Sequence, residues 1–141
     1  MKLLLAVDGS DCSLRAVDHL IELVAQWRTP PQIHLLHVHP PIPLGRVQAH
    51  IGKETLTAHY REEGEAALAT AQQRLAAAGL AYTPHLHVGL PAEVIVHQAE
   101  LLAVDQVVIG SHGRTALAGV LLGSVVQKLA QLLKTPLLLV K

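Results

Sequence analysis

The sequence has few aromatic residues and no excess of charge of either sign. Phenylalanine is absent, aromatic residues make up 2% of the chain, and 11 Lys and Arg balance 11 Asp and Glu. Nucleic-acid binders ordinarily carry a basic surface, and single-strand binders stack bases on aromatic rings. A polybasic membrane anchor would also need an excess of Lys and Arg. These shortages argue against nucleic acid and against a membrane surface as partners.

Cysteine and long apolar runs are also scarce. The one cysteine, Cys12, excludes an intrachain disulfide framework and fits a reducing compartment. No stretch approaches the ~18 uninterrupted apolar residues of a membrane span. The apolar run at residues 3–7 is shorter than the roughly 7–15 residues that a secretion signal needs. We therefore expect a cytoplasmic protein that neither crosses nor binds a membrane.

Apolar residues are abundant and regularly placed. They make up 50% of 141 residues, which suits one domain with a sizeable core over residues 1–141. Their spacing predicts strands at 2–8, 32–38, 82–88, 105–109 and 137–140, and helices at 11–28, 53–79, 91–102 and 124–134. Because parallel strands need crossovers, this strict alternation indicates an α/β fold: an open five-stranded parallel sheet with helices on both faces. Pro84 favours an edge position for the third strand.

Two segments lie where a sheet of this kind binds ligands, beyond the carboxyl ends of its strands. The turn at residues 8–10 follows the first strand, and a glycine-rich segment at 110–124 follows the fourth. Glycines let a ligand approach the main chain, and a helix that begins at Ser124 would offer unpaired N–H groups to phosphates. The alternative is a loop whose glycines only form turns.

The glycine-rich segment carries a recognisable spacing. Gly110-Ser111-His112-Gly113 is followed, after nine residues, by Gly123-Ser124. This spacing resembles the G-2x-G-9x-G-(S/T) signature of the ATP-binding branch of the universal stress protein family. Similarity to the family extends along the chain through the segments AVDGSDCSLRA, LLHV, GLPAEVI and TPLLLVK.

The resemblance implies a Rossmann-like fold of the adenine nucleotide alpha hydrolase type, with strand order 3-2-1-4-5. It also implies an adenine nucleotide across strands one, two and four. Carried over by position, the nucleotide-binding residues are Ala6, Val7, Asp8, Val38, Ile109, Gly110, His112, Gly113, Arg114, Gly123, Ser124, Val125 and Val126. Residues 6–8 and Val38 would meet the nucleoside. Residues 109–114 would run beside the ribose and phosphates. Residues 123–126, at the start of the last helix, would hold the phosphates.

The resemblance further implies ATP, with Mg²⁺, as the ligand. Asp8 would accept hydrogen bonds from ribose hydroxyls or orient a phosphate-bound Mg²⁺, or would instead cap the first turn. Arg114 would donate to phosphate if its side chain turned inward, and would otherwise only solvate the loop. No metal site made of protein side chains alone is predicted.

Residues for efficient catalysis are missing from the sequence. There is no P-loop lysine and no evident base for an attacking water. We therefore predict no catalytic residue and a binding module with a regulatory output in the stress response. The alternatives are a slow ATPase or autophosphorylating enzyme that uses the same pocket, or a structural dimer without nucleotide.

Histidine is unusually frequent, with 10 residues in the chain. His34, His37 and His39 lie on or just after the second strand, and His85 and His87 lie on the third. If these strands are neighbours, His37 and His39 share a face, as do His85 and His87, so a metal cluster is conceivable. Polar strand ends are the simpler interpretation.

The last strand, at residues 137–140, is short and apolar, and the family's order places it at an edge of the sheet. An unprotected apolar edge invites pairing with another chain. The resemblance therefore implies a homodimer through this C-terminal strand.

Overall fold

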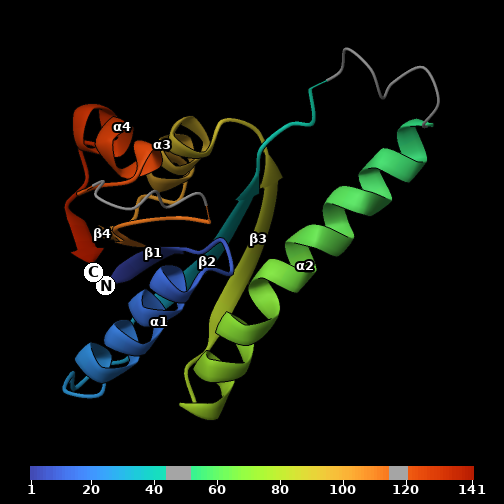
Figure 1. Cartoon of the computed structure of the whole chain (residues 1–141). Coiled ribbons are helices and arrows are strands. Elements are labelled where there is room, and N and C mark those ends of the chain that lie inside the picture. The colour runs from blue at the N-terminus through green and yellow to red at the C-terminus, as the bar shows by residue number, and fades with distance from the viewer. Residues whose placement is uncertain (44–51, 115–120) are drawn as a thin grey trace.

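The computed structural model describes residues 1–43, 52–114 and 121–141. Strands and helices alternate along the chain (Figure 1). The strands are β1 (Lys2–Ala6), β2 (Gln32–His39), β3 (Tyr82–Val88), β4 (Gln106–Gly110) and β5 (Leu137–Val140). The helices are α1 (Asp11–Val24), α2 (Lys53–Ala77), α3 (Pro91–Leu101) and α4 (Ser124–Leu132). Within these described ranges, no helix is long and apolar enough to cross a membrane.

All five strands form one parallel sheet in the order β3-β2-β1-β4-β5. This confirms the predicted fold class, the strand order and the edge position of β3. The chain moves outward from β1 to β3, and then returns to β4 on the other side of β1. Crossovers on the two sides of β1 therefore diverge, and they leave a crevice above the carboxyl ends of β1, β2 and β4.

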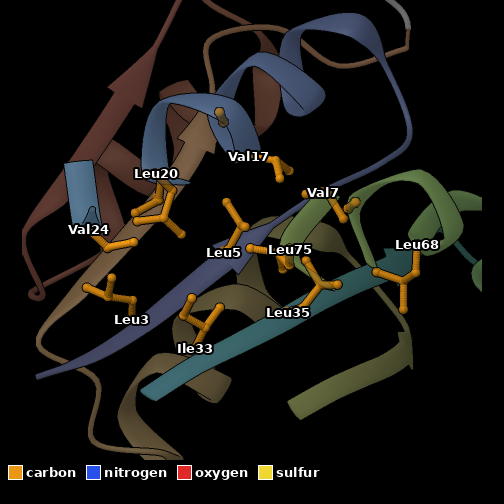
Figure 2. Close-up of a cluster of buried hydrophobic side chains, with 13 residues drawn as sticks. Leu3, Leu5, Val7, Val17, Leu20, Val24, Ile33, Leu35, Leu68 and Leu75 are labelled. Atoms are coloured by element: carbon orange, nitrogen blue, oxygen red, sulfur yellow. The ribbon is translucent and has the colours of Figure 1, made fainter. Parts of the chain in front are cut away.

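Helices cover both faces of the sheet, and each face has its own core. On one face α1 and α2 pack on alternate residues of the strands, among them Leu5 and Leu35, which are fully buried (Figure 2). On the other face α3 and α4 pack on the intervening residues, among them Leu4 and Leu36. Successive residues of a strand point to opposite faces of the sheet, and the central strands are apolar on both faces. The sheet can therefore be covered by a helical layer on each side.

Local signals explain the starts of α1 and α3 and the end of α2. Ser10 caps α1, because its Oγ accepts the N–H of Ser13 at 3.2 Å. Pro91 opens α3 at a position where an N–H would have no partner in the helix. Gly79 follows α2 with a φ of +70°, the left-handed conformation that ends helices.

Two predicted ends, those of the first strand and the first helix, differ from the observed ones by two and four residues. Apolar spacing predicts a first strand that includes Asp8, but β1 ends at Ala6, because the backbone N–H of Asp8 turns toward the Ser13 hydroxyl at 3.4 Å. The predicted first helix includes Arg28, but α1 ends at Val24, since the N–H groups of Gln26 and Trp27 bond to carbonyls three residues back and tighten the chain into a turn. The other predicted ends lie within two residues of the observed ones.

Candidate functional site

A cleft of about 710 Å³ opens above the carboxyl ends of β1, β2 and β4. Its volume falls in the range of about 300–1,000 Å³ that is typical of small-molecule sites. The structure brings every residue predicted for the nucleotide to its wall: Ala6, Val7, Asp8, Val38, Ile109, Gly110, His112, Gly113, Arg114, Gly123, Ser124, Val125 and Val126. Residues from three distant segments therefore share one concave surface.

Sequence reasoning missed part of the wall. The additional lining residues are Ser13, Leu36, His37, His39, Pro40, Pro91, Ile95, Leu122 and Gln127. Ser13 and Pro91 come from the first turns of α1 and α3, which the crevice geometry places beside the strand ends. For His37 and His39 a signal existed, because they flank the predicted Val38 at the end of an apolar strand.

One side of the cleft is apolar and continues the core beneath α3 and α4. Ala6, Val38, Ile95 and Ile109 belong both to that core and to the cleft wall. Val126, from the first turn of α4, completes it. This surface suits a flat, weakly polar group such as a heterocyclic ring.

The Asp8 carboxylate lies at the centre of the polar side. Its Oδ1 accepts the N–H of Ser10 at 3.0 Å, and its Oδ2 accepts the N–H of Arg114 at 3.0 Å. Burial works to raise the pKa of Asp8, but hydrogen bonds from Ser10, Ser13 and the Arg114 backbone outweigh it and lower the pKa. Asp8 is therefore a fixed anion that caps the turn after β1 and faces the cleft.

Arg114 connects the segment after β4 to the turn after β1 through hydrogen bonds to Asp8. Its Nε donates to the Asp8 carbonyl at 2.6 Å, while its backbone N–H bonds to the carboxylate of the same residue. The guanidinium lies over Gly9, where an added Cβ would come within 3.2 Å of it. The side chain thus packs against the turn after β1 in this structure.

Two glycines of the signature sit where an added side chain would force a neighbouring group to shift. A Cβ on Gly113 would lie 2.7 Å from Asp8 Oδ2, and a Cβ on Gly110 would lie 2.8 Å from the backbone of Cys12. Gly110 lets the end of β4 pack against the start of α1. Gly113 lets the backbone N–H of Arg114 reach the Asp8 carboxylate.

The amino end of α4 points its free amides at the cleft. Gly123 caps the helix, and the first intrahelical bond runs from the Gln127 N–H to the Gly123 carbonyl at 3.0 Å. The N–H groups of residues 124–126 precede that bond, so the helix supplies no carbonyl for them. Within the described part of the chain, α4 is also the helix without an acidic residue in its first turn.

His37 is buried in the floor of the cleft. Its Nδ1 lies 2.8 Å from the Val7 carbonyl, which only accepts, so Nδ1 carries the proton. Burial lowers the pKa of His37, and the bond to Val7 only partly opposes this effect. The ring is therefore neutral near pH 7, with Nε2 as an acceptor.

The metal cluster that the strand histidines made conceivable does not form. β2 and β3 are neighbours, but His37 pairs in register with Leu86, and His85 pairs with Leu36. Paired residues of parallel strands point to the same face, so His37 and His39 face α2 whereas His85 and His87 face the opposite side. In residues 1–43, 52–114 and 121–141, no three metal-ligating side chains come together.

Cys12 is buried behind the cleft. Its Sγ lies 3.6 Å from the Ser111 hydroxyl and 3.5 Å from the Val140 carbonyl. Burial works to raise the pKa of the thiol, but hydrogen bonds from Ser111 and His112 together with the charge of Arg15 lower it.

Comparison with known proteins finds similarity to universal stress proteins, both in sequence and in structure. The sequence model described as "Universal stress protein family" matches residues 1–141. Universal stress protein MJ0531 of Methanocaldococcus jannaschii is 30% identical over 140 residues, which cover 99% of this chain and 81% of that protein.

Solved structures agree with the sequence comparison. The structure of MJ0577 matches with a TM-score of 0.85 and 29% identity, over 99% of this chain and 94% of that one. A universal stress protein in complex with cAMP matches with a TM-score of 0.71 and 28% identity, over 100% and 97% of the two chains. Two proteins of the same fold, from Arabidopsis thaliana and Archaeoglobus fulgidus, were solved with AMP and dAMP at 18% and 22% identity.

Proposed function

Because the chain belongs to the universal stress protein family, we propose that it binds ATP with Mg²⁺ in the cleft and acts as a nucleotide-dependent regulatory module of the stress response. Residues 1–141 would form one domain of this family, and the nucleotide would lie across the ends of β1, β2 and β4. The cytoplasmic location expected from the sequence remains a prediction.

The observation that carries the proposal is the amino end of α4. Its free amides, the partial positive charge of the helix and the hydroxyl of Ser124 converge on the cleft. Since no acidic side chain of the first turn neutralises this end of α4, an anionic group such as a phosphate chain is the favoured occupant. Mg²⁺ would be held through the phosphates and by Asp8.

The opposite side of the cleft suits the nucleoside. The apolar wall around Val38 and Ile109 can receive the adenine ring, and the Asp8 carboxylate can accept hydrogen bonds from ribose hydroxyls. A relative at 28% identity was solved in complex with cAMP, which supports an adenine nucleotide as the ligand class.

The test begins with the purified protein to which no nucleotide has been added. Denaturation followed by mass spectrometry identifies any bound nucleotide, and calorimetry measures ATP affinity. Near-stoichiometric ATP, or a micromolar dissociation constant, supports the proposal. No nucleotide and no heat would contradict it.

Gly123→Val locates the site. An added Cβ would lie 3.3 Å from the Ser111 carbonyl and 3.4 Å from the Cα of His112. The branched side chain would therefore push the start of α4 away from the segment after β4, and we expect ATP affinity to fall more than tenfold. Gly52→Val is the matched control, because Gly52 has nothing within 4 Å of an added Cβ. Thermal melting confirms that both variants fold. A folded Gly123→Val protein with unchanged affinity would refute the pocket assignment.

A slow ATPase or autophosphorylating enzyme is the alternative use of the same cleft. It would show sustained release of ADP or AMP, or phosphate on the chain, and Gly113→Val or Gly123→Val would abolish this product. Bound ADP or AMP in place of ATP would favour this alternative. The lowered pKa of Asp8 makes it a weak proton acceptor, which favours binding over turnover.

We also propose that β5 forms a homodimer. β5 is an edge strand, and all four of its residues are only half-buried. The carbonyls of Pro136 and Val140 bond toward β4, so by alternation the N–H groups of Leu137 and Leu139 face outward. Sedimentation velocity should show a dimer, and Leu139→Pro, which removes an outward N–H, should shift a folded protein toward monomer. A monomeric native protein would contradict the proposal.

A further inference from the structure

The side of the β2–β3 pair that faces away from α2 carries a second group of histidines. His34 pairs in register with Thr83, and Leu36 pairs with His85, so the two histidines are diagonal neighbours on one face of the sheet. His34 Nδ1 and His85 Nε2 lie 3.0 Å apart, with ring centroids at 5.2 Å. Both side chains are half-buried and reachable from solvent. This pair lies outside the cleft.

We propose that His34 and His85 form a two-histidine site for a divalent late transition metal of the Cu²⁺ or Ni²⁺ type. Imidazole nitrogens coordinate such ions at about 2.0–2.1 Å. Two nitrogens at that distance from one ion and about 90° apart are separated by roughly 3.0 Å, whereas a tetrahedral angle needs about 3.4 Å. The observed separation of 3.0 Å therefore matches adjacent positions of a square-planar or octahedral site.

The protonation state of the pair suits metal binding. Burial lowers the pKa of both rings, with further lowering from Lys2 at His34 and from His34 and His87 at His85. Neutral rings each keep one lone pair. The ring that donates in the present hydrogen bond must move its proton to its other nitrogen, so that both facing nitrogens can coordinate without losing a proton from the pair.

A nearby positive charge and the small number of protein ligands limit the affinity of the site for a metal ion. Lys2 is the neighbouring cation, and its ammonium is held by the Leu102 carbonyl at 3.1 Å. In the described residues no third metal-ligating side chain joins the pair, so water would fill the remaining positions. We expect moderate affinity and a preference for Cu²⁺ and Ni²⁺ over Zn²⁺.

Cu²⁺ is the probe, added to nucleotide-free protein without a purification tag and in the presence of glycine to suppress weaker sites. Calorimetry should show a highest-affinity site that loses at least tenfold in affinity in His34→Gln and in His85→Gln. His97→Gln, on α3, is the matched control and should bind as the native protein does. Electron paramagnetic resonance at one equivalent, on a sample without glycine, should show two coordinating nitrogens.

A second readout does not depend on affinity fitting. Because the ion would join β2 to the edge strand β3 only in the folded state, it should raise the melting temperature. The rise should disappear in His85→Gln. Equal Cu²⁺ binding by the native protein and both pair variants, or a single nitrogen in the resonance spectrum, would overturn the proposal. Loss of the site in His87→Gln alone would also overturn it, because the assigned pair would be wrong.

Discussion

The central strands β1, β2 and β4 pass through two different environments. Their inner halves are packed in the apolar core, whereas their carboxyl ends border the cleft. Leu35 and His37 are two residues apart on β2 and point to the same face of the sheet. Leu35 is sealed among apolar side chains beneath α1 and α2, whereas His37 bonds to a main-chain carbonyl and faces the cleft. The contrast teaches that the residues that form the core and the residues that line the cleft are different residues of one strand.

The largest expected effect separates stability from binding. Leu35→Ala removes a fully buried side chain, so we expect the free energy of unfolding to fall by about 2–5 kcal/mol. ATP affinity should change less than about twofold in the protein that remains folded, because no ligand-side contact is altered. Urea denaturation and calorimetry measure the two quantities. Leu101→Ala is the control, since Leu101 is 67% exposed.

If Leu35→Ala lowered ATP affinity as much as Gly123→Val does, core packing and ligand binding could not be changed independently. The contrast between core and cleft would then reflect one cooperative unit, in which any loss of packing opens the site.

Gly113→Ala should have the opposite pattern to Leu35→Ala, with a smaller loss of stability and a larger loss of ATP affinity. Its methyl group would meet Asp8 Oδ2 at 2.7 Å, so the carboxylate must shift and weaken its bond to the Arg114 N–H. We expect a loss of stability of about 1 kcal/mol, with a fall in ATP affinity of up to about tenfold. Gly52→Ala, where the added methyl has open space, should change neither. Native affinity in Gly113→Ala would show that the position of Asp8 does not matter to the ligand.

The smallest expected effect is a dependence on pH. The pKa of His37 is lowered by burial in the folded state, so the unfolded chain binds its proton first as the pH falls. The free energy of unfolding should therefore decrease below pH ~6.5 until the folded pKa is passed, with a slope from this residue of at most about 1.4 kcal/mol per pH unit. Lowered pKa values at His34 and His85 contribute with the same sign. Asp8, with a lowered pKa, loses its contribution only in more acidic solution.

Urea denaturation between pH 5 and 8 measures this dependence. His37→Gln keeps an N–H donor for the Val7 carbonyl but cannot be protonated, so its unfolding free energy should vary less with pH. A profile parallel to that of the native protein would assign the dependence to other histidines.

Much of the fold could be predicted from sequence because its signals are local. Apolar runs and helical spacing located every element, although α1 stops at Val24 and β1 at Ala6. Those ends depend on hydrogen bonds between a turn and its neighbours, which apolar spacing does not report. The glycine spacing of the 110–124 segment likewise pointed to the residues that line the cleft.

Other features could not be predicted, because they depend on contacts between distant segments. The packing of the Arg114 side chain on the turn after β1 joins residues 106 positions apart. The hydrogen bond between His37 and the Val7 carbonyl joins residues 30 positions apart, and nothing in the strand of His37 indicates that partner.

The sequence by itself determined the alternating α/β order, the apolar composition of the central strands and the glycine-rich segment after β4, because each of these depends on neighbours in the chain. Only the tertiary structure decided how the histidines combine. Alternation separates His37 from His85 once β2 and β3 pair in register, and the same register brings His34 to His85 across 51 positions. Register depends on how β2 packs against α2 and α3 and on how β3 packs against α2, and packing of that kind is a property of the assembled sheet.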